Sequence, residues 1–62
     1  MELYQLTKVD GTKLCKVRFF EEFMSHYTEE NDGSDFMVRT YKRLGRSKEE
    51  LIKEYQELGY AE

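Results

Sequence analysis

Apolar and polar residues alternate along the first twenty residues in the manner of a β-hairpin. From Cys15 to Phe19, apolar side chains alternate with charged ones, which predicts a strand with one buried and one solvent-facing side. The preceding arm alternates less cleanly, because Leu3 and Leu6 are three residues apart and would point to opposite faces of a regular strand. We therefore expect a one-residue bulge or a three-residue loop. Residues 9–12 are centred on Asp-Gly, which accommodates the positive φ angles of a tight turn.

A different spacing follows the hairpin. Apolar residues recur at i, i+3, i+4 and i+7, namely Phe20, Phe23, Met24 and Tyr27. This is the spacing of one helical face, and two glutamates in the first turn suit the positive end of a helix dipole. The pattern therefore predicts a short helix over 20–27. Residues 29–34 lack apolar side chains and contain Asn-Asp-Gly, which predicts an exposed loop.

The next segment is ambiguous between strand and helix. A run of apolar residues with a threonine and a tyrosine allows a third strand near 35–41. Met37, Tyr41 and Leu44 have a spacing that suits a helix instead, and Gly45 could end it in the left-handed conformation. We favour the helix and keep the strand as the alternative.

The last segment carries the strongest helix signals. Ser47 and Glu50 match a capping box, in which the serine hydroxyl accepts from the Glu50 amide. The expected apolar stripe consists of Leu51, Ile52, Tyr55 and Leu58. Gly59 suits the left-handed position after the helix, and Tyr60 is placed to pack back on Tyr55 as a Schellman contact.

These elements together predict a single small α+β domain spanning residues 1–62. Its architecture would be an N-terminal β-hairpin packed against two or three short α-helices, with a third strand near 35–41 as the alternative. A chain of 62 residues buries only about 60% of its unfolded surface, so its stability should be low. The short, proline-free arrangement resembles that of small bacterial or bacteriophage reading frames.

Composition excludes several classes of protein. The single cysteine, Cys15, cannot form an intramolecular disulfide, and the longest apolar runs are far shorter than a bilayer span. We therefore expect a cytoplasmic protein without membrane contact. Only Cys15 and His26 are available as thiol and imidazole ligands, so we expect no metal and no cofactor. Cys15 is expected to be buried and His26 to face water, and no catalytic residue is predicted; the protein should not be an enzyme.

The charges are unevenly distributed along a chain with a formal net charge of −3. Residues 36–48 hold five cationic side chains and no acidic one: Arg39, Lys42, Arg43, Arg46 and Lys48. Arginines near aromatic rings can grip phosphates and stack on bases, which makes nucleic-acid binding through these residues the alternative function. The competing interpretation is that neighbouring glutamates neutralise this basic band.

The leading hypothesis is a non-enzymatic protein-interaction module, such as a regulator or inhibitor of a larger protein, or a protein that self-associates as a homodimer. Four phenylalanines and five tyrosines exceed what one very small core needs. Surplus aromatic rings together with arginine are typical of the centres of protein interfaces. The predicted partner-binding patch is Phe36, Arg39, Tyr41 and Arg43.

Overall fold

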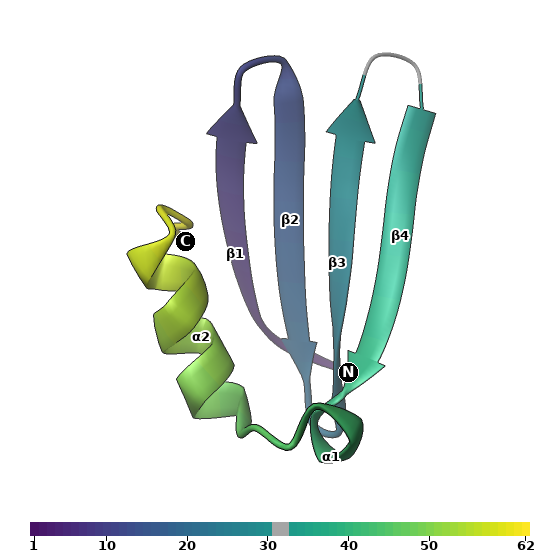
Figure 1. Cartoon of the computed structure of the whole chain (residues 1–62), viewed down its shortest axis with the longest axis vertical. Helices are drawn as coiled ribbons and strands as arrows, with labels where there is room; N and C mark the ends of the chain where they lie inside the picture. The colour runs from purple at the N-terminus through teal and green to yellow at the C-terminus, as the bar shows by residue number, and fades with distance from the viewer. Residues whose placement is uncertain (31–32) are drawn as a thin grey trace.

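Within residues 1–30 and 33–62, which the computed structural model describes, four strands pair in the order of the sequence. They form one antiparallel sheet of order β1-β2-β3-β4 (Figure 1). The strands are β1 (Glu2–Asp10), β2 (Lys13–Phe20), β3 (Phe23–Glu30) and β4 (Gly33–Thr40). Because each strand pairs with the next one along the chain, β1 and β4 are the two edges of the sheet.

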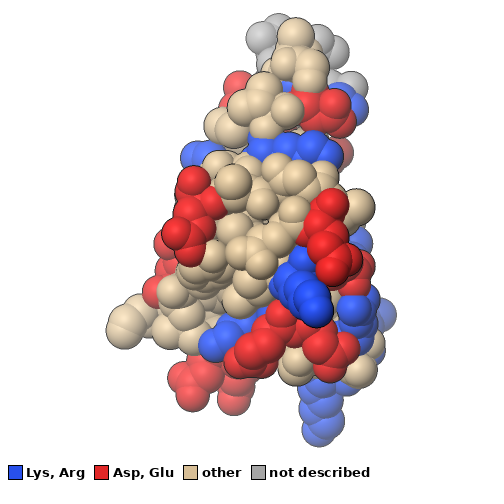
Figure 2. Space-filling view, turned by 90° about the vertical axis from the view of Figure 1, so that its left-hand side faces the viewer, with Lys and Arg blue, Asp and Glu red and all other residues tan. Residues whose placement is uncertain are grey.

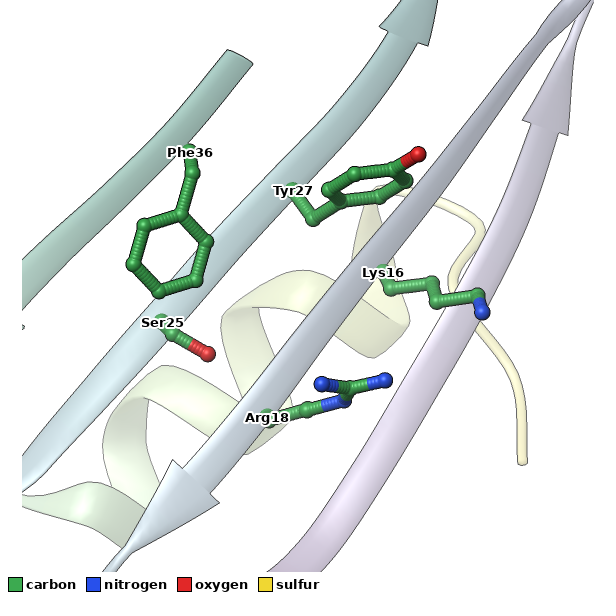
Figure 3. A pocket seen from close by; sticks show the side chains of 5 residues that line it. All are labelled: Lys16, Arg18, Ser25, Tyr27 and Phe36. Atoms are coloured by element: carbon green, nitrogen blue, oxygen red, sulfur yellow. The ribbon is translucent and has the colours of Figure 1, made fainter. Parts of the chain in front are cut away.

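Two helices follow the sheet, a single turn α1 (Tyr41–Leu44) and the longer α2 (Lys48–Glu57). α2 runs along the β1 side of the molecule in Figure 1 and lies behind the strands in Figure 3. The chain then returns to β1, where the Thr7 amide donates to the Ala61 carbonyl at 2.7 Å and the Thr7 carbonyl accepts from the Ala61 amide at 2.9 Å. We call the face of the sheet that α2 covers the inner face, and the opposite one the outer face.

The core lies between the inner face and α2. Its buried apolar side chains are Leu6, Val17, Phe19, Met24 and Leu51. Leu51 is the buried residue of α2, and Tyr55 one turn later packs edge-on against the ring of Phe19 at 6.2 Å. α2 lies on the inner face, and among residues 1–30 and 33–62 no comparable layer covers the outer face. The fold is therefore a sheet covered on one face.

The predicted fold class is wrong, since the chain is mainly sheet and not a hairpin with two or three helices. Residues 20–27 form the end of β2, a turn and most of β3 instead of a helix. The i, i+3 pair is explained by the turn, because Phe20 and Phe23 flank it and their rings stack at 4.4 Å. Met24 then points inward and Tyr27 outward, the alternation of a strand that β2 stabilises by pairing.

The favoured helix near 35–45 is also wrong over most of its length. β4 continues to Thr40, so the alternative third-strand prediction near 35–41 describes this segment better. Only the end is helical: Thr40 caps α1 by accepting from the Arg43 amide, and Gly45 ends it with φ of 67° as predicted. The exposed loop predicted over 29–34 is shorter, because β3 reaches Glu30 and β4 begins at Gly33; residues 31–32 lie outside the described residues.

The local signals at both ends of the chain are confirmed. The β1–β2 register shifts between Glu2 and Tyr4, which is the bulge expected from the parity of the apolar residues. Gly11 has φ of 65° in the hairpin turn. In α2, the Ser47 hydroxyl accepts from the Glu50 amide at 3.2 Å.

The C-terminal end of α2 forms the predicted Schellman motif. The amide of Gly59 donates to Gln56 and that of Tyr60 to Tyr55, each at 3.1 Å. The rings of Tyr55 and Tyr60 meet edge-on at 5.1 Å, as expected for the contact that accompanies this motif. Leu58, expected in the apolar stripe, is instead 56% exposed.

Candidate interaction surface

The outermost strand, β4, presents an unusual run of exposed apolar side chains. Phe36, Met37 and Val38 are 65%, 48% and 52% exposed. β4 pairs with β3 on one side only, whereas the other edge of the sheet, β1, is bridged to the end of the chain at Thr7. The edge of β4 therefore combines a backbone free to hydrogen bond with apolar side chains on both faces.

The alternation of β4 assigns these side chains to the two faces. Phe36 stands opposite Tyr27 and Val38 opposite the buried Ser25, so both belong to the outer face. Met37 stands opposite His26 on the inner face. Since α2 lies toward β1, it does not cover Met37, and this part of the inner face stays open to solvent.

A shallow hollow of about 140 Å³ lies on the outer face beside β4. Figure 3 shows its lining side chains, which come from β2, β3 and β4: Lys16, Arg18, Ser25, Tyr27 and Phe36. The Arg18 side chain is directed toward β1, where Nε lies 3.1 Å from Gln5 Oε1 and 3.3 Å from Glu2 Oε1. Its charge is therefore partly compensated, and the hollow is mainly an aromatic surface next to one lysine.

The predicted partner-binding residues do not form one surface. Phe36 lies on the outer face of β4 and Arg39 on the inner face, where its guanidinium contacts the Met37 sulfur at 2.9 Å. Tyr41 is half-buried in α1 and donates its hydroxyl to the carbonyl of Phe20 at 2.7 Å. Burial raises the pKa of Tyr41, which keeps this hydroxyl protonated. Tyr41 thus anchors α1 to the β2–β3 turn.

Arg39 and Arg43 lie together where β4 ends and α1 begins. They border an open depression of about 490 Å³ that also includes Met37 and Leu44. Arg43 is exposed on α1, and no ion pair joins it or Arg39 to an acidic residue in the part of the chain that the structure describes. Arg39 and Arg43 therefore place two positive charges near this end of β4.

The predicted basic band is partly neutralised. Arg46 pairs with Glu54 and lies 3.9 Å from Glu50, both on the first turns of α2. Lys42 is exposed and Lys48 half-buried, and neither has an ion pair within residues 1–30 and 33–62. Seen from the α2 side, acidic and basic side chains intermingle (Figure 2). The competing interpretation thus holds for Arg46 only.

His26 does not face water as expected, but lies half-buried on the inner face. Its Nε2 is 3.5 Å from the Tyr60 hydroxyl, and its ring meets that of Tyr55 at 6.0 Å. Burial, aided by the charge of Arg39, lowers the pKa of His26 below its usual value. Burial and the nearby Cys15 raise the pKa of Tyr60 to about 12. The imidazole and the phenol are therefore uncharged near neutral pH, which suits a packed cluster.

Sequence reasoning missed the importance of Met37 and Val38. The signal was present as three consecutive apolar residues at 36–38, but their exposure follows from the edge position of β4, which depends on the whole topology. In the described ranges, no three histidine, cysteine or acidic side chains gather as metal ligands. None of the described helices has the length and apolar character needed to cross a membrane.

Comparisons with family models, with curated proteins and with solved structures find no match to this chain.

Proposed function

We propose that this protein is a non-enzymatic interaction module that binds an extended protein segment by β-strand addition at β4. The observation that carries the proposal is the exposure of Phe36, Met37 and Val38 on an edge strand. Soluble proteins usually protect such edges with charged residues, proline, a bulge or a covering loop. Residues 36–38 contain none of these residue types, and the β3–β4 register runs without a shift from Phe23 to Glu30.

Strand addition explains why apolar residues occur on both faces of β4. An added strand takes main-chain hydrogen bonds from the edge and places its alternate side chains against the two faces. On the outer face these side chains would meet Phe36 and Val38, and on the inner face Met37. The proposed partner is therefore an extended segment with consecutive apolar residues, so that apolar side chains point to both faces of the sheet. A cytoplasmic location is part of the proposal, supported by the free thiol of Cys15.

A peptide selection tests this function. A displayed library of linear peptides is selected against the protein, and enriched peptides are measured against the Val38→Lys and Leu58→Lys variants. Both residues are about equally exposed, at 52% and 56%, but only Val38 lies on β4. We expect Val38→Lys to abolish binding, Leu58→Lys to retain it, and bound peptide to slow amide hydrogen exchange in β4. Peptides that bind both variants equally would contradict the proposal, as would a selection that enriches no peptide from a protein that also stays monomeric.

Nucleic-acid binding is the second candidate, because Arg39, Lys42 and Arg43 are exposed near the end of β4. Tyr27 and Phe36 also stand side by side on the outer face, where rings can stack on bases. This function requires affinity for a labelled single-stranded oligonucleotide that falls steeply with salt and is lost on replacing two of these cations. Salt-independent or undetectable binding would exclude it.

A further inference from the structure

We infer that the segment which β4 binds is β4 of a second copy of this chain, paired antiparallel about Met37. The inference rests on the proposed function and specifies its partner. It starts from the charges on either side of Met37: Asp35 lies two residues before it and Arg39 two residues after it. All three side chains belong to the inner face, and all three are exposed.

The strand is complementary to itself in this register. With Met37 opposite Met37 of the second copy, Asp35 stands opposite Arg39 of that copy, and the two-fold axis repeats this pair. On the outer face, Phe36 stands opposite Val38 of the second copy, again twice. Each charge thus meets its opposite, and each apolar side chain meets an apolar one.

Asp35 and Arg39 cannot satisfy each other within one chain. Four residues along a strand span about 13 Å, well beyond the reach of a salt bridge. An antiparallel copy brings them into direct opposition, where opposite charges stabilise a sheet and like charges destabilise it.

Other registers lose this complementarity. Parallel pairing in register would place Asp35 opposite Asp35 of the second copy. A slip of two residues in the antiparallel pair puts Arg39 opposite Met37 or opposite Gly33. A slip of one residue places inner-face side chains of one copy opposite outer-face side chains of the other. The second sheet would then be turned over, with its inner face on the outer side of the first. The register about Met37 is therefore the one that the side chains favour.

The position of α2 does not obstruct this pairing. α2 lies on the β1 side of the molecule, away from β4, so a second sheet can continue from the edge without meeting it (Figure 1). The pairing gives partners to the exposed backbone of β4 and reduces the exposure of Phe36, Met37 and Val38.

Charge reversal with rescue tests the pairing. Sedimentation equilibrium is measured for the native protein, Asp35→Arg, Arg39→Asp and the double variant, with circular dichroism to confirm that each is folded. Each single change turns both attractive pairs into repulsive ones, so we expect the dimer dissociation constant to rise about tenfold or more. The double change restores opposite charges, so the dimer dissociation constant should return to within about threefold of the native value. Single variants without effect, or a double variant no better than the singles, would overturn the inference.

Cross-linking tests the register. In a Cys15→Ala background, Met37→Cys places two thiols on the two-fold axis with Cα atoms roughly 5 Å apart, within disulfide range. The matched control, Val38→Cys, places them roughly 8 Å apart, beyond the limit of about 7 Å. We expect oxidation to cross-link the first variant and leave the second largely monomeric. Equal cross-linking of both, or preferential cross-linking of the control, would refute this register.

The outcomes also separate this inference from the proposed function. A native protein that stays monomeric at every concentration, yet binds selected peptides through β4, overturns the inference and leaves the function intact. A dimer that Val38→Lys does not weaken forms through another surface, which likewise overturns the inference. Failure of both peptide binding and self-association would overturn both.

Discussion

Replacing Leu51 with alanine tests how the sheet is covered. Leu51 is 5% exposed and is the residue through which α2 enters the core beside Leu6, Val17 and Phe19. A buried leucine-to-alanine change costs about 2–5 kcal/mol through lost transfer energy and the cavity left behind. At roughly 0.05–0.15 kcal/mol per residue, a chain of 62 residues has about 3–9 kcal/mol of total stability. Leu51→Ala should therefore remove about half of it.

The control for this prediction is Leu58→Ala, which makes the same chemical change at the end of the same helix. Leu58 is 56% exposed, so its truncation should cost about 1 kcal/mol or less. Urea titrations followed by far-ultraviolet circular dichroism compare the two variants. With a slope near 1 kcal/mol/M, the midpoint of the Leu51 variant should fall by about 2–5 M. Equal midpoints for the two variants would refute the reasoning that Leu51 is the main attachment of α2.

Two further predictions concern polar contacts of the core. Tyr41→Phe removes the hydroxyl that donates to the Phe20 carbonyl at 2.7 Å and should lower the free energy of unfolding by about 1 kcal/mol in the same titration; an unchanged midpoint would contradict the anchoring role. For His26, burial and then Arg39 lower the folded-state pKa, so the unfolded chain binds more protons as pH falls through about 6.5. Stability should fall between about pH 7.5 and about pH 5.5, and less so in His26→Gln, because this is the sole histidine. Equal losses in both proteins would show that His26 does not contribute.

The features predicted well from the sequence depend on short stretches of chain. The capping box at Ser47, the Schellman motif at Gly59 and the bulge near Leu3 each depend on a few neighbouring residues, and the structure contains all three. The buried side of β2, with Cys15 and Phe19, was also predicted, because strict alternation over a strand has one interpretation.

The errors occurred where the same residues satisfy two periodicities. Phe23 and Tyr27 are four residues apart, a spacing that places them on one face of a helix and also on one face of a strand. Pairing of this segment with β2 and β4 favours the strand over the helix, and the residues of the segment alone do not reveal that these partners are present. The candidate surface was partly predicted for the same reason: Phe36 and Arg39 were selected by type, but their separation onto two faces follows from the strand.

The order of the strands also bears on how the chain folds. Neighbours in the sheet are neighbours in sequence, so each hairpin can form from local contacts, which is typical of rapidly folding topologies. The bridge between Thr7 and Ala61 is different, because it joins residues 54 positions apart. Loop closure over that distance should come late, so the bridge to β1 should form near the end of folding. Among the residues that the structure describes, the backbone edge of β4 has no such bridge to wait for and is accessible to another strand throughout folding.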